Sequence, residues 1–109
     1  MSDILTWLLL IPATGPIVPL LSFASDEEAV RKANNTHYGL GASVWSSDIE
    51  RANAIAEKIE AGTVWVNAHF DMGPQFPFGG HKESGIGTEQ GVTGLKSYCN
   101  SQTLYLRKV

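Results

Sequence analysis

Cysteine is nearly absent from this sequence, since Cys99 is the only one among 109 residues. A single cysteine cannot form an internal disulfide, which excludes the disulfide framework of a small secreted domain and favours a reducing, cytoplasmic location. An excess of basic residues is absent too, because eight Lys and Arg face eleven Asp and Glu and the net charge is −3. Phosphate binding requires clustered Lys and Arg, so nucleic acid is not expected as a partner.

The N-terminal apolar run is too short to cross a membrane. Residues 4–11 read ILTWLLLI, eight residues where a transmembrane helix needs about 20. A signal peptide is also disfavoured, because the only early charge is Asp3 and signal peptides begin with basic residues. We expect a core or interface segment here, with a signal or membrane anchor as the alternative, and no membrane partner.

Nucleotide and metal motifs are missing as well. The chain has no phosphate-binding P-loop. Gly85-Ile86-Gly87 starts like a dinucleotide fingerprint, but Gln90 stands where the third glycine belongs and no strand directly precedes it. The three histidines lack ligand spacing, and one cysteine cannot complete a zinc site. We therefore expect no cofactor-binding and no metal-binding residues.

The apolar and capping patterns that are present predict an α/β fold. Hydrophobic residues make up 43% of the chain, and three short β-prone runs predict strands, over residues 17–23, 41–45 and 63–67. Ser-x-x-Glu capping boxes place helix starts at Ser25 and Ser47. These helices are expected to end at Asn34-Asn35 and at Gly62. The β-α-β-α-β order predicts a parallel unit.

Residues 68–90 break this pattern and form a Gly/Pro-rich loop without periodicity. Beyond it we expect a short helix over 89–98 and a C-terminal strand over 103–106. The loop places titratable side chains beside apolar ones. The titratable residues are His69, Asp71, His81, Lys82 and Glu83. The apolar residues are Phe70, Met72, Phe76 and Phe78.

Two interpretations of this loop remain open. In one, the apolar side chains line a pocket and His69, Asp71, His81 or Glu83 act as acid and base. In the other, the polar side chains are solvated and the aromatic ones pin the loop to the sheet. Cys99 has no nucleophile signature and is expected to be a small half-buried residue.

Longer motifs carry a family resemblance. The sequence GTVWVN over 62–67, followed by PFGGHKESGIG over 77–87, resembles the C-terminal signature of the NAD(P)-dependent aldehyde dehydrogenase superfamily. The motifs Gly15-Pro16, YGLGASVW over 38–45 and EAG over 60–62 stand in the family's order and spacing. The resemblance covers about residues 15–107.

The resemblance implies a partial catalytic domain. Residues 15–109 would be a C-terminal catalytic-domain fragment ending in a strand of the oligomerisation sheet, and residues 1–14 would be a non-family apolar segment. In the family, the cofactor domain, the catalytic cysteine and the general-base glutamate lie upstream of this region. The family motif Glu-x-Phe-Gly-Pro, which contacts the nicotinamide and its ribose, here reads Pro12-Ala13-Thr14-Gly15-Pro16. A truncated gene copy with a new start would have this pattern, and so would a split exon or an error in the gene model.

The resemblance also assigns roles within the loop. The segment after the third strand lines the family's substrate tunnel, which makes tunnel candidates of Asn67, Phe70, Met72, Phe76 and Phe78. The glycines of 79–87 would shape the backbone and bind no phosphate.

Three functional hypotheses follow. The chain is expected to be a truncated aldehyde dehydrogenase-like protein that neither binds NAD(P) nor oxidises an aldehyde alone, and to be a homo-oligomer or to associate with a full-length homologue. An alternative is a cofactor-independent isomerase, cyclase or dehydratase of specialised metabolism that binds a small-molecule substrate in the remaining tunnel. A further alternative is an interaction partner of a full-length homologue.

Overall fold

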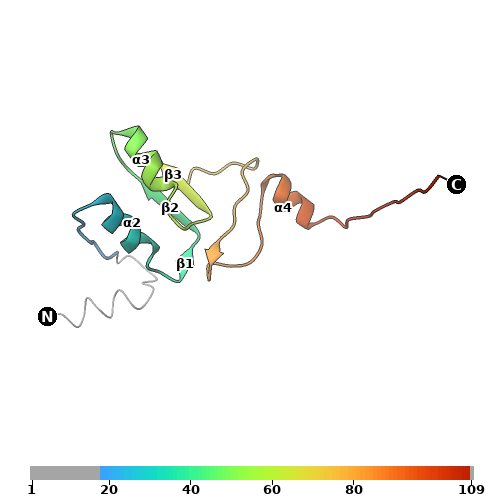
Figure 1. The fold of residues 1–109 in the computed structure, drawn as a ribbon, viewed down its shortest axis with the longest axis horizontal. Helices are drawn as coiled ribbons and strands as arrows, with labels where there is room; N and C mark the ends of the chain where they lie inside the picture. Colours follow the sequence, from blue (N-terminus) through green and yellow to red (C-terminus); the bar gives the residue numbers. More distant parts are fainter. Residues whose placement is uncertain (1–17, 109) are drawn as a thin grey trace.

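Two parallel strands form the centre of the fold. The computed structural model describes residues 18–108, and in it β2 (Gly41–Val44) pairs in parallel with β3 (Thr63–Val66) along its whole length. α3 (Ile49–Ala56) joins the two strands and packs against both (Figure 1). Parallel strands joined by a helix are the unit that the alternating pattern predicts, so the α/β fold class is confirmed.

α2 (Asp26–Asn34) begins at the predicted residue. Ser25 is the N-cap, and its Oγ accepts a hydrogen bond from the Glu28 N–H at 3.2 Å. The Glu28 side chain reaches back and accepts from the Ala24 N–H at 2.8 Å. The helix therefore starts with the reciprocal capping that the Ser-x-x-Glu spacing predicts.

Hydrogen bonds attach α2 to α3 and to the turn that follows it. Arg51 donates to both carboxylate oxygens of Asp26, from Nε at 2.8 Å and from Nη2. Asn34 donates from Nδ2 to the Lys58 carbonyl at 2.8 Å and accepts at Oδ1 from the Glu60 N–H at 2.9 Å. Because no residue of α2 is buried, these polar contacts contribute much of what holds the helix in place.

A short antiparallel pair that the sequence pattern does not predict lies beside this unit. β1 (Tyr38–Gly39) pairs with β4 (His81–Lys82), which comes from the glycine-rich loop. The Lys82 Nζ donates to the carbonyl of Asn34 at 2.8 Å and forms an ion pair with Glu60 at 2.7 Å. Lys82 thus ties the loop to the end of α2, so its role here is structural.

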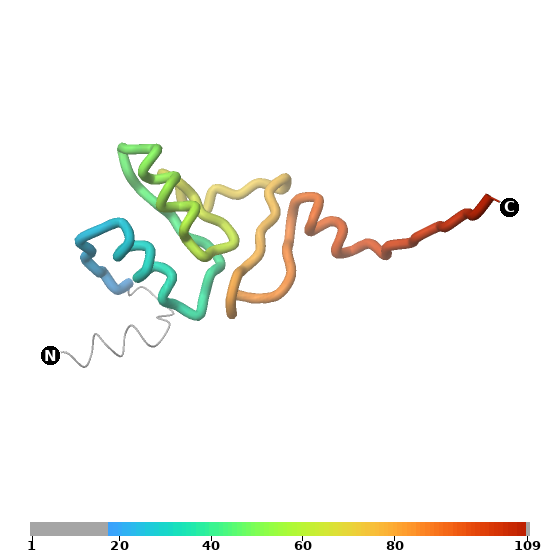
Figure 2. Tube along the Cα trace, viewed as in Figure 1, coloured from blue at the N-terminus to red at the C-terminus, as the bar shows by residue number. Residues whose placement is uncertain are grey.

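Two of the predicted strands are wrong. Residues 18–23 have no regular secondary structure, and residue 17 lies outside the described part of the chain. The predicted strand over 103–106 is an extended, unpaired segment that leads away from α4 (Gly91–Ser97), as Figure 2 shows. A strand needs a hydrogen-bonded neighbour, and within residues 18–108 β2 and β3 pair only with each other. Pro19 also removes a backbone donor from the first run.

The predicted helix ends also need correction. α3 is capped by Asp48, whose carboxylate accepts from the Arg51 N–H at 3.0 Å, so Ser47 is not the cap. The same helix ends at Ala56, and a turn leads from there to Gly62. α4 is shorter than the predicted 89–98, because the backbone of Glu89 exchanges hydrogen bonds with Phe78 instead.

Features of the N-terminal segment lie outside the described residues. These are the apolar run over 4–11 and the sequence Pro12–Pro16 that replaces the family's cofactor motif. Within residues 18–108, no helix is long and apolar enough to cross a membrane.

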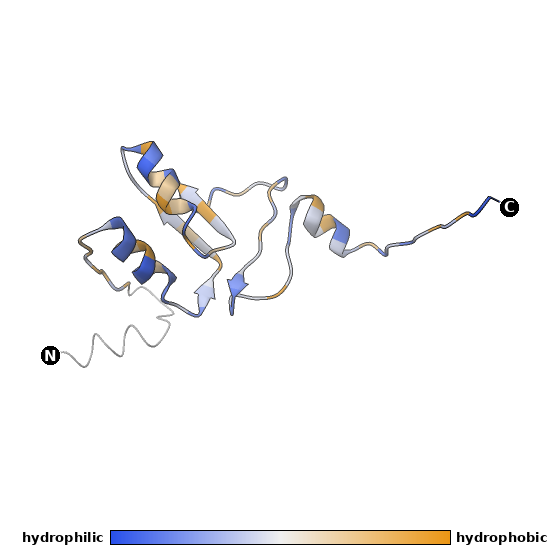
Figure 3. Cartoon of the chain, in the orientation of Figure 1, coloured by the Kyte–Doolittle hydropathy of each residue, from blue (hydrophilic) through white to orange (hydrophobic). Residues whose placement is uncertain are grey.

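The buried core of the described residues is small. Ala52 and Trp65 are the only buried hydrophobic residues among them, although apolar segments gather in β2, β3 and α3 (Figure 3). The accessible surface is 9463 Å², whereas a compact chain of 11.8 kDa exposes roughly 6,000 Å². Large apolar side chains are exposed instead, among them Phe23, Trp45, Leu95, Tyr98 and Leu104. The apolar faces of this unit are therefore left uncovered by residues 18–108.

Gly62 has a packing role and does not terminate a helix. A Cβ at this position would overlap the carbonyl oxygen of Gly79, and the Gly62 N–H donates to the Gly39 carbonyl at 3.0 Å. The glycine-rich loop thus crosses directly over the start of β3, where there is no room for a side chain.

We expect Gly62→Ala to destabilise the fold by about 1–3 kcal/mol, because the loop must move away from β3. Thermal unfolding followed by circular dichroism measures the change. Gly73→Ala is the matched control, since its nearest neighbour is the flexible side chain of Gln75. Equal melting temperatures for the two variants would show that the close approach is unimportant.

We also expect the contact between Asp26 and Arg51 to make stability depend on pH. The hydrogen bond from Arg51 holds the pKa of Asp26 below its ordinary value. A lowered pKa in the folded state adds stability above the unfolded-state pKa, and this stability is lost as the pH falls through the folded-state pKa. Asp26→Asn should therefore flatten the fall in melting temperature between about pH 5 and pH 3. In an Arg51→Gln background the same substitution should change little, and an equal effect in both backgrounds would contradict the assignment.

Candidate functional site

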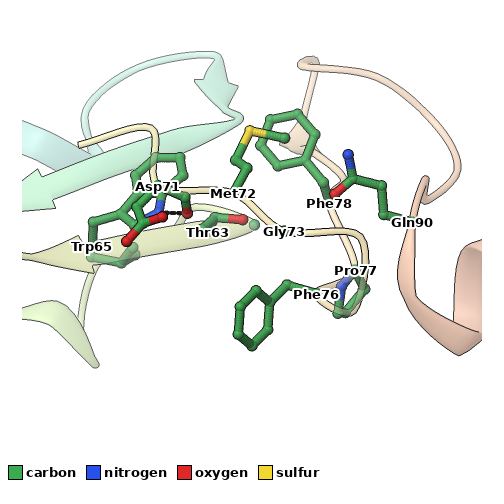
Figure 4. A pocket seen from close by; sticks show the side chains of 11 residues that line it. Thr63, Trp65, Asp71, Met72, Gly73, Phe76, Pro77, Phe78 and Gln90 are labelled. Carbon is green, nitrogen blue, oxygen red and sulfur yellow. Dashed lines mark hydrogen bonds between the residues drawn. The ribbon is translucent and has the colours of Figure 1, made fainter. Parts of the chain in front are cut away.

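An apolar cavity of about 470 Å³ lies between β3 and the loop that follows it (Figure 4). The start of β3 and the strand itself supply one wall, and the loop and the residue before α4 supply the other. The lining residues are Gly62, Thr63, Val64, Trp65, Asp71, Met72, Gly73, Phe76, Pro77, Phe78 and Gln90. Asp71 is the only titratable side chain among them, so the cavity suits an apolar group.

Trp65 organises this cavity. It is 9% exposed, and its Nε1 donates to the backbone carbonyl of Asp71 at 2.8 Å. Its ring lies 5.8 Å from the His69 ring, edge to face, and 6.0 Å from the Phe70 ring. Phe70 in turn meets Phe78 edge to face at 6.4 Å. A single buried indole therefore fixes the loop backbone and anchors the aromatic cluster.

The far side of the loop is bonded to the segment before α4. Phe78 and Glu89 exchange two backbone hydrogen bonds of 2.8 and 2.7 Å. The Gly91 N–H donates to the Pro74 carbonyl at 2.9 Å. The predicted loop over 68–90 is therefore fixed at both ends, and Met72, Phe76 and Phe78 within it line the cavity.

Three of the five tunnel candidates line the cavity, namely Met72, Phe76 and Phe78. Phe70 packs beside them without lining it. Asn67 has a φ of 53° and bonds Ser46 twice, accepting from its N–H and donating to its carbonyl, both at 2.8 Å. In this structure Asn67 thus joins the ends of β2 and β3, and its place in a tunnel stays a prediction.

The four acid–base candidates are not brought together. His69 forms a hydrogen bond of 2.8 Å between its Nδ1 and the Ser43 Oγ, while Asp71 lines the cavity. Glu83 lies 3.8 Å from His37, and His81 is part of β4. Among residues 18–108, no side-chain hydrogen bond or ion pair joins any two of the four. The arrangement gives no support to an acid–base centre.

The sequence patterns did not identify several of the lining residues as part of a site. Among these are Thr63, Trp65 and Gln90. Thr63 and Trp65 stand at alternate positions of a strand, and alternate side chains point to the same face of a sheet. The period does not account for the whole wall, however, because Val64 between them also lines the cavity. Gln90 carries no such signal, because it reaches the cavity through the turn before α4, where its φ is 60°.

Carboxylates stand at the starts of two of the described helices, α2 and α3. Pyrophosphate binds where a helix N-terminus offers free N–H groups. The first turn of α2 contains Asp26, Glu27 and Glu28, and α3 is capped by the carboxylate of Asp48, so both ends would repel phosphate. Within residues 18–108 no group of three or more His, Cys, Asp or Glu is placed to hold a metal ion.

Comparisons with known proteins agree on one family. The profile of the Aldehyde dehydrogenase family matches residues 12–104. The putative aldehyde dehydrogenase FUS7 of Gibberella fujikuroi is 49% identical over 94 residues, which are 86% of this chain and 20% of FUS7. The mitochondrial aldehyde dehydrogenase of Homo sapiens is 44% identical over 93 residues, which are 85% of this chain and 18% of that protein. The chain thus spans about a fifth of the length of the curated relatives it matches.

Solved structures show the same fold. A point mutant of betaine aldehyde dehydrogenase from Staphylococcus aureus, in complex with NAD+, matches with a TM-score of 0.75 and 44% sequence identity, over 77% of this chain and 17% of that chain. The likeness confirms the resemblance and the partial α/β domain predicted from the motifs. Because one relative is named as mitochondrial, the cytoplasmic location stays a prediction.

We expect Trp65→Phe to loosen the loop over 68–78. The phenylalanine keeps most of the buried area but loses the hydrogen bond to the Asp71 carbonyl, which costs about 1 kcal/mol. Amide hydrogen exchange in the loop should speed up by about fivefold. Trp45→Phe is the matched control, because Trp45 is 66% exposed. Similar exchange rates in both variants would contradict the role of Trp65.

Proposed function

Because the chain belongs to the aldehyde dehydrogenase family, we propose that it supplies the C-terminal part of a catalytic domain that oxidises an aldehyde to an acid with NAD(P)+. In this proposal residues 15–109 are the catalytic-domain segment and residues 1–14 are an addition to it. The observation that carries the proposal is the apolar cavity beside β3, within the segment that matches the family.

The proposed role of the cavity is to hold the apolar part of the aldehyde. Met72, Phe76 and Phe78 present a thioether and two aromatic rings, which favour an aliphatic or aromatic substituent over a charged one. Burial of that substituent would exclude water and orient the carbonyl carbon toward groups outside residues 18–108. The cavity thereby sets substrate preference and does not itself transfer a hydride.

We further propose that the 109 residues by themselves do not oxidise aldehydes. Aldehyde oxidation in such an enzyme needs an activated nucleophile and a bound cofactor. Cys99, the single cysteine, is exposed and not half-buried as predicted; it does not line the cavity, and its Sγ lies 3.6 Å from the Leu95 carbonyl. The carboxylates at the starts of α2 and α3 argue against NAD(P) binding by this segment alone.

Assembly with a larger partner is part of the same proposal. The exposed apolar side chains of α4 and the C-terminal segment include Leu95, Tyr98 and Leu104. Covering them requires the remainder of a catalytic domain or further copies of the chain, in a homo-oligomer or with a full-length homologue. An extended segment with free backbone groups is well suited to pairing with a sheet edge.

A chimeric enzyme tests the function. Residues 15–104 replace the matching fifth of FUS7, and NADH formation is followed with an apolar aldehyde. We expect the chimera to be active and Met72→Ala within it to raise KM for that aldehyde by about tenfold with little change in kcat, because apolar contact is lost. Glu57→Ala, an exposed polar position just after α3 and outside the cavity, should change neither.

The isolated chain, with NAD+ and the same aldehyde, should form no NADH. Turnover by the isolated chain would overturn the proposal that it acts only as part of a larger domain. A folded but inactive chimera, or one in which Met72→Ala leaves KM unchanged, would contradict the role of the cavity.

A further inference from the structure

Gln90 brings a neutral polar group to the largely apolar cavity beside β3. Among the described residues that line this cavity, it alone carries a side-chain amide. Figure 4 shows Gln90 on the Phe78 side of the cavity, whereas Asp71 lies on the Trp65 side. An amide offers hydrogen-bond donors and an acceptor without a net charge. This end of the cavity can therefore pair with an uncharged polar group of a ligand.

The backbone of Gln90 has an unfavourable conformation. Its φ is 60° and its ψ is 176°, a region that is almost confined to glycine. A glycine at position 90 would adopt the same angles without strain. The next residue, Gly91, is a glycine and also has a positive φ, of 57°. The strain at Gln90 thus arises because this position carries a side chain.

Hydrogen bonds of the neighbouring residues hold this strained conformation in place. Glu89 exchanges two backbone bonds with Phe78, of 2.8 and 2.7 Å. On the other side, the Gly91 N–H donates to the Pro74 carbonyl at 2.9 Å. Both neighbours of Gln90 are therefore bonded to the loop that forms the cavity. The Gln90 side chain is kept at the cavity wall as a result.

The fold makes little use of the amide itself. Gln90 directly precedes α4, but its side chain accepts no hydrogen bond from the first turn of that helix. The bonds that hold Glu89 and Gly91 are backbone bonds, which a glycine at position 90 would also allow. Backbone strain that the fold does not require is typical of binding and active sites. A ligand at the cavity is the partner that would use this amide.

We infer that Gln90 is a specificity-determining residue, which selects aldehydes that carry a hydroxyl or carbonyl oxygen on their apolar chain. The inference rests on the proposed function and narrows its substrate class. Met72 and Phe76 contact the apolar chain, and the Gln90 amide forms a hydrogen bond with the oxygen. A wholly apolar chain displaces water from the amide without replacing its hydrogen bonds, so it binds less well.

Kinetics of the chimeric enzyme test this inference. The substrates are straight-chain aldehydes from butanal to decanal and their ω-hydroxy derivatives, so that the hydroxyl is placed at different depths. Gln90→Leu removes the amide and keeps a side chain of similar bulk. For at least one chain length it should lower kcat/KM for the hydroxy aldehyde, relative to the plain one, by about fivefold. Gln75→Leu is the matched control, because Gln75 is exposed and outside the cavity, and the ratio should not change.

Gln90→Gly in the 109-residue chain tests the strain separately. It should raise the melting temperature by about 4 °C, because glycine adopts the observed angles freely. In the chimera it should lower the preference for the hydroxy aldehyde as Gln90→Leu does. Gln75→Gly is the control and should give no rise, because glycine adds freedom to the unfolded chain.

The possible failures are distinguishable. An active chimera in which Gln90→Leu leaves the ratio unchanged at every chain length would overturn this inference and leave the proposed function standing. A chimera inactive with every aldehyde would overturn both. A melting temperature that does not rise in Gln90→Gly would also overturn the inference, because position 90 would then hold no strain for a binding role to explain.

Discussion

The burial of Trp65 is the interaction on which the rest of the site depends. Gly41, at the start of β2, makes room for it, because a Cβ there would lie 2.8 Å from the indole ring. The ring then closes one wall of the cavity, and its N–H holds the loop through the Asp71 carbonyl. The strand pair, the aromatic cluster and the cavity are thus linked through one side chain in a two-stranded sheet.

The same constraint explains what the chain leaves exposed. A parallel sheet normally carries cover on both faces, and among the described residues α3 is the helix that contacts both strands. Polar contacts such as that between Asp26 and Arg51 hold α2 in position and bury little apolar surface. The unit has the fold of a partial aldehyde dehydrogenase domain, and residues 18–108 leave its apolar faces uncovered.

Prediction from the sequence succeeds here where the signal is local. Short sequence patterns predict the cap at Ser25 and the parallel strands that contain Val44 and Val66. The glycine-rich signature is another short pattern, and together with the other family motifs it identifies the family. Prediction fails where a partner is needed. The extended residues 103–106 have strand composition but no neighbour, and the cap at Asp48 displaces the predicted Ser47 by one residue. The convergence of acid–base groups could not be judged from the sequence either, because it depends on distances across the loop.

The surface exposed on unfolding tests the central claim most directly, namely that this chain is one part of a larger catalytic domain. The slope of the unfolding free energy against urea concentration scales with that surface. We expect the isolated chain to unfold in a shallow transition, with a slope below about 1 kcal/mol per M. A single steep transition with a slope clearly above about 1 kcal/mol per M would contradict it, because the chain would then bury a complete core of its own.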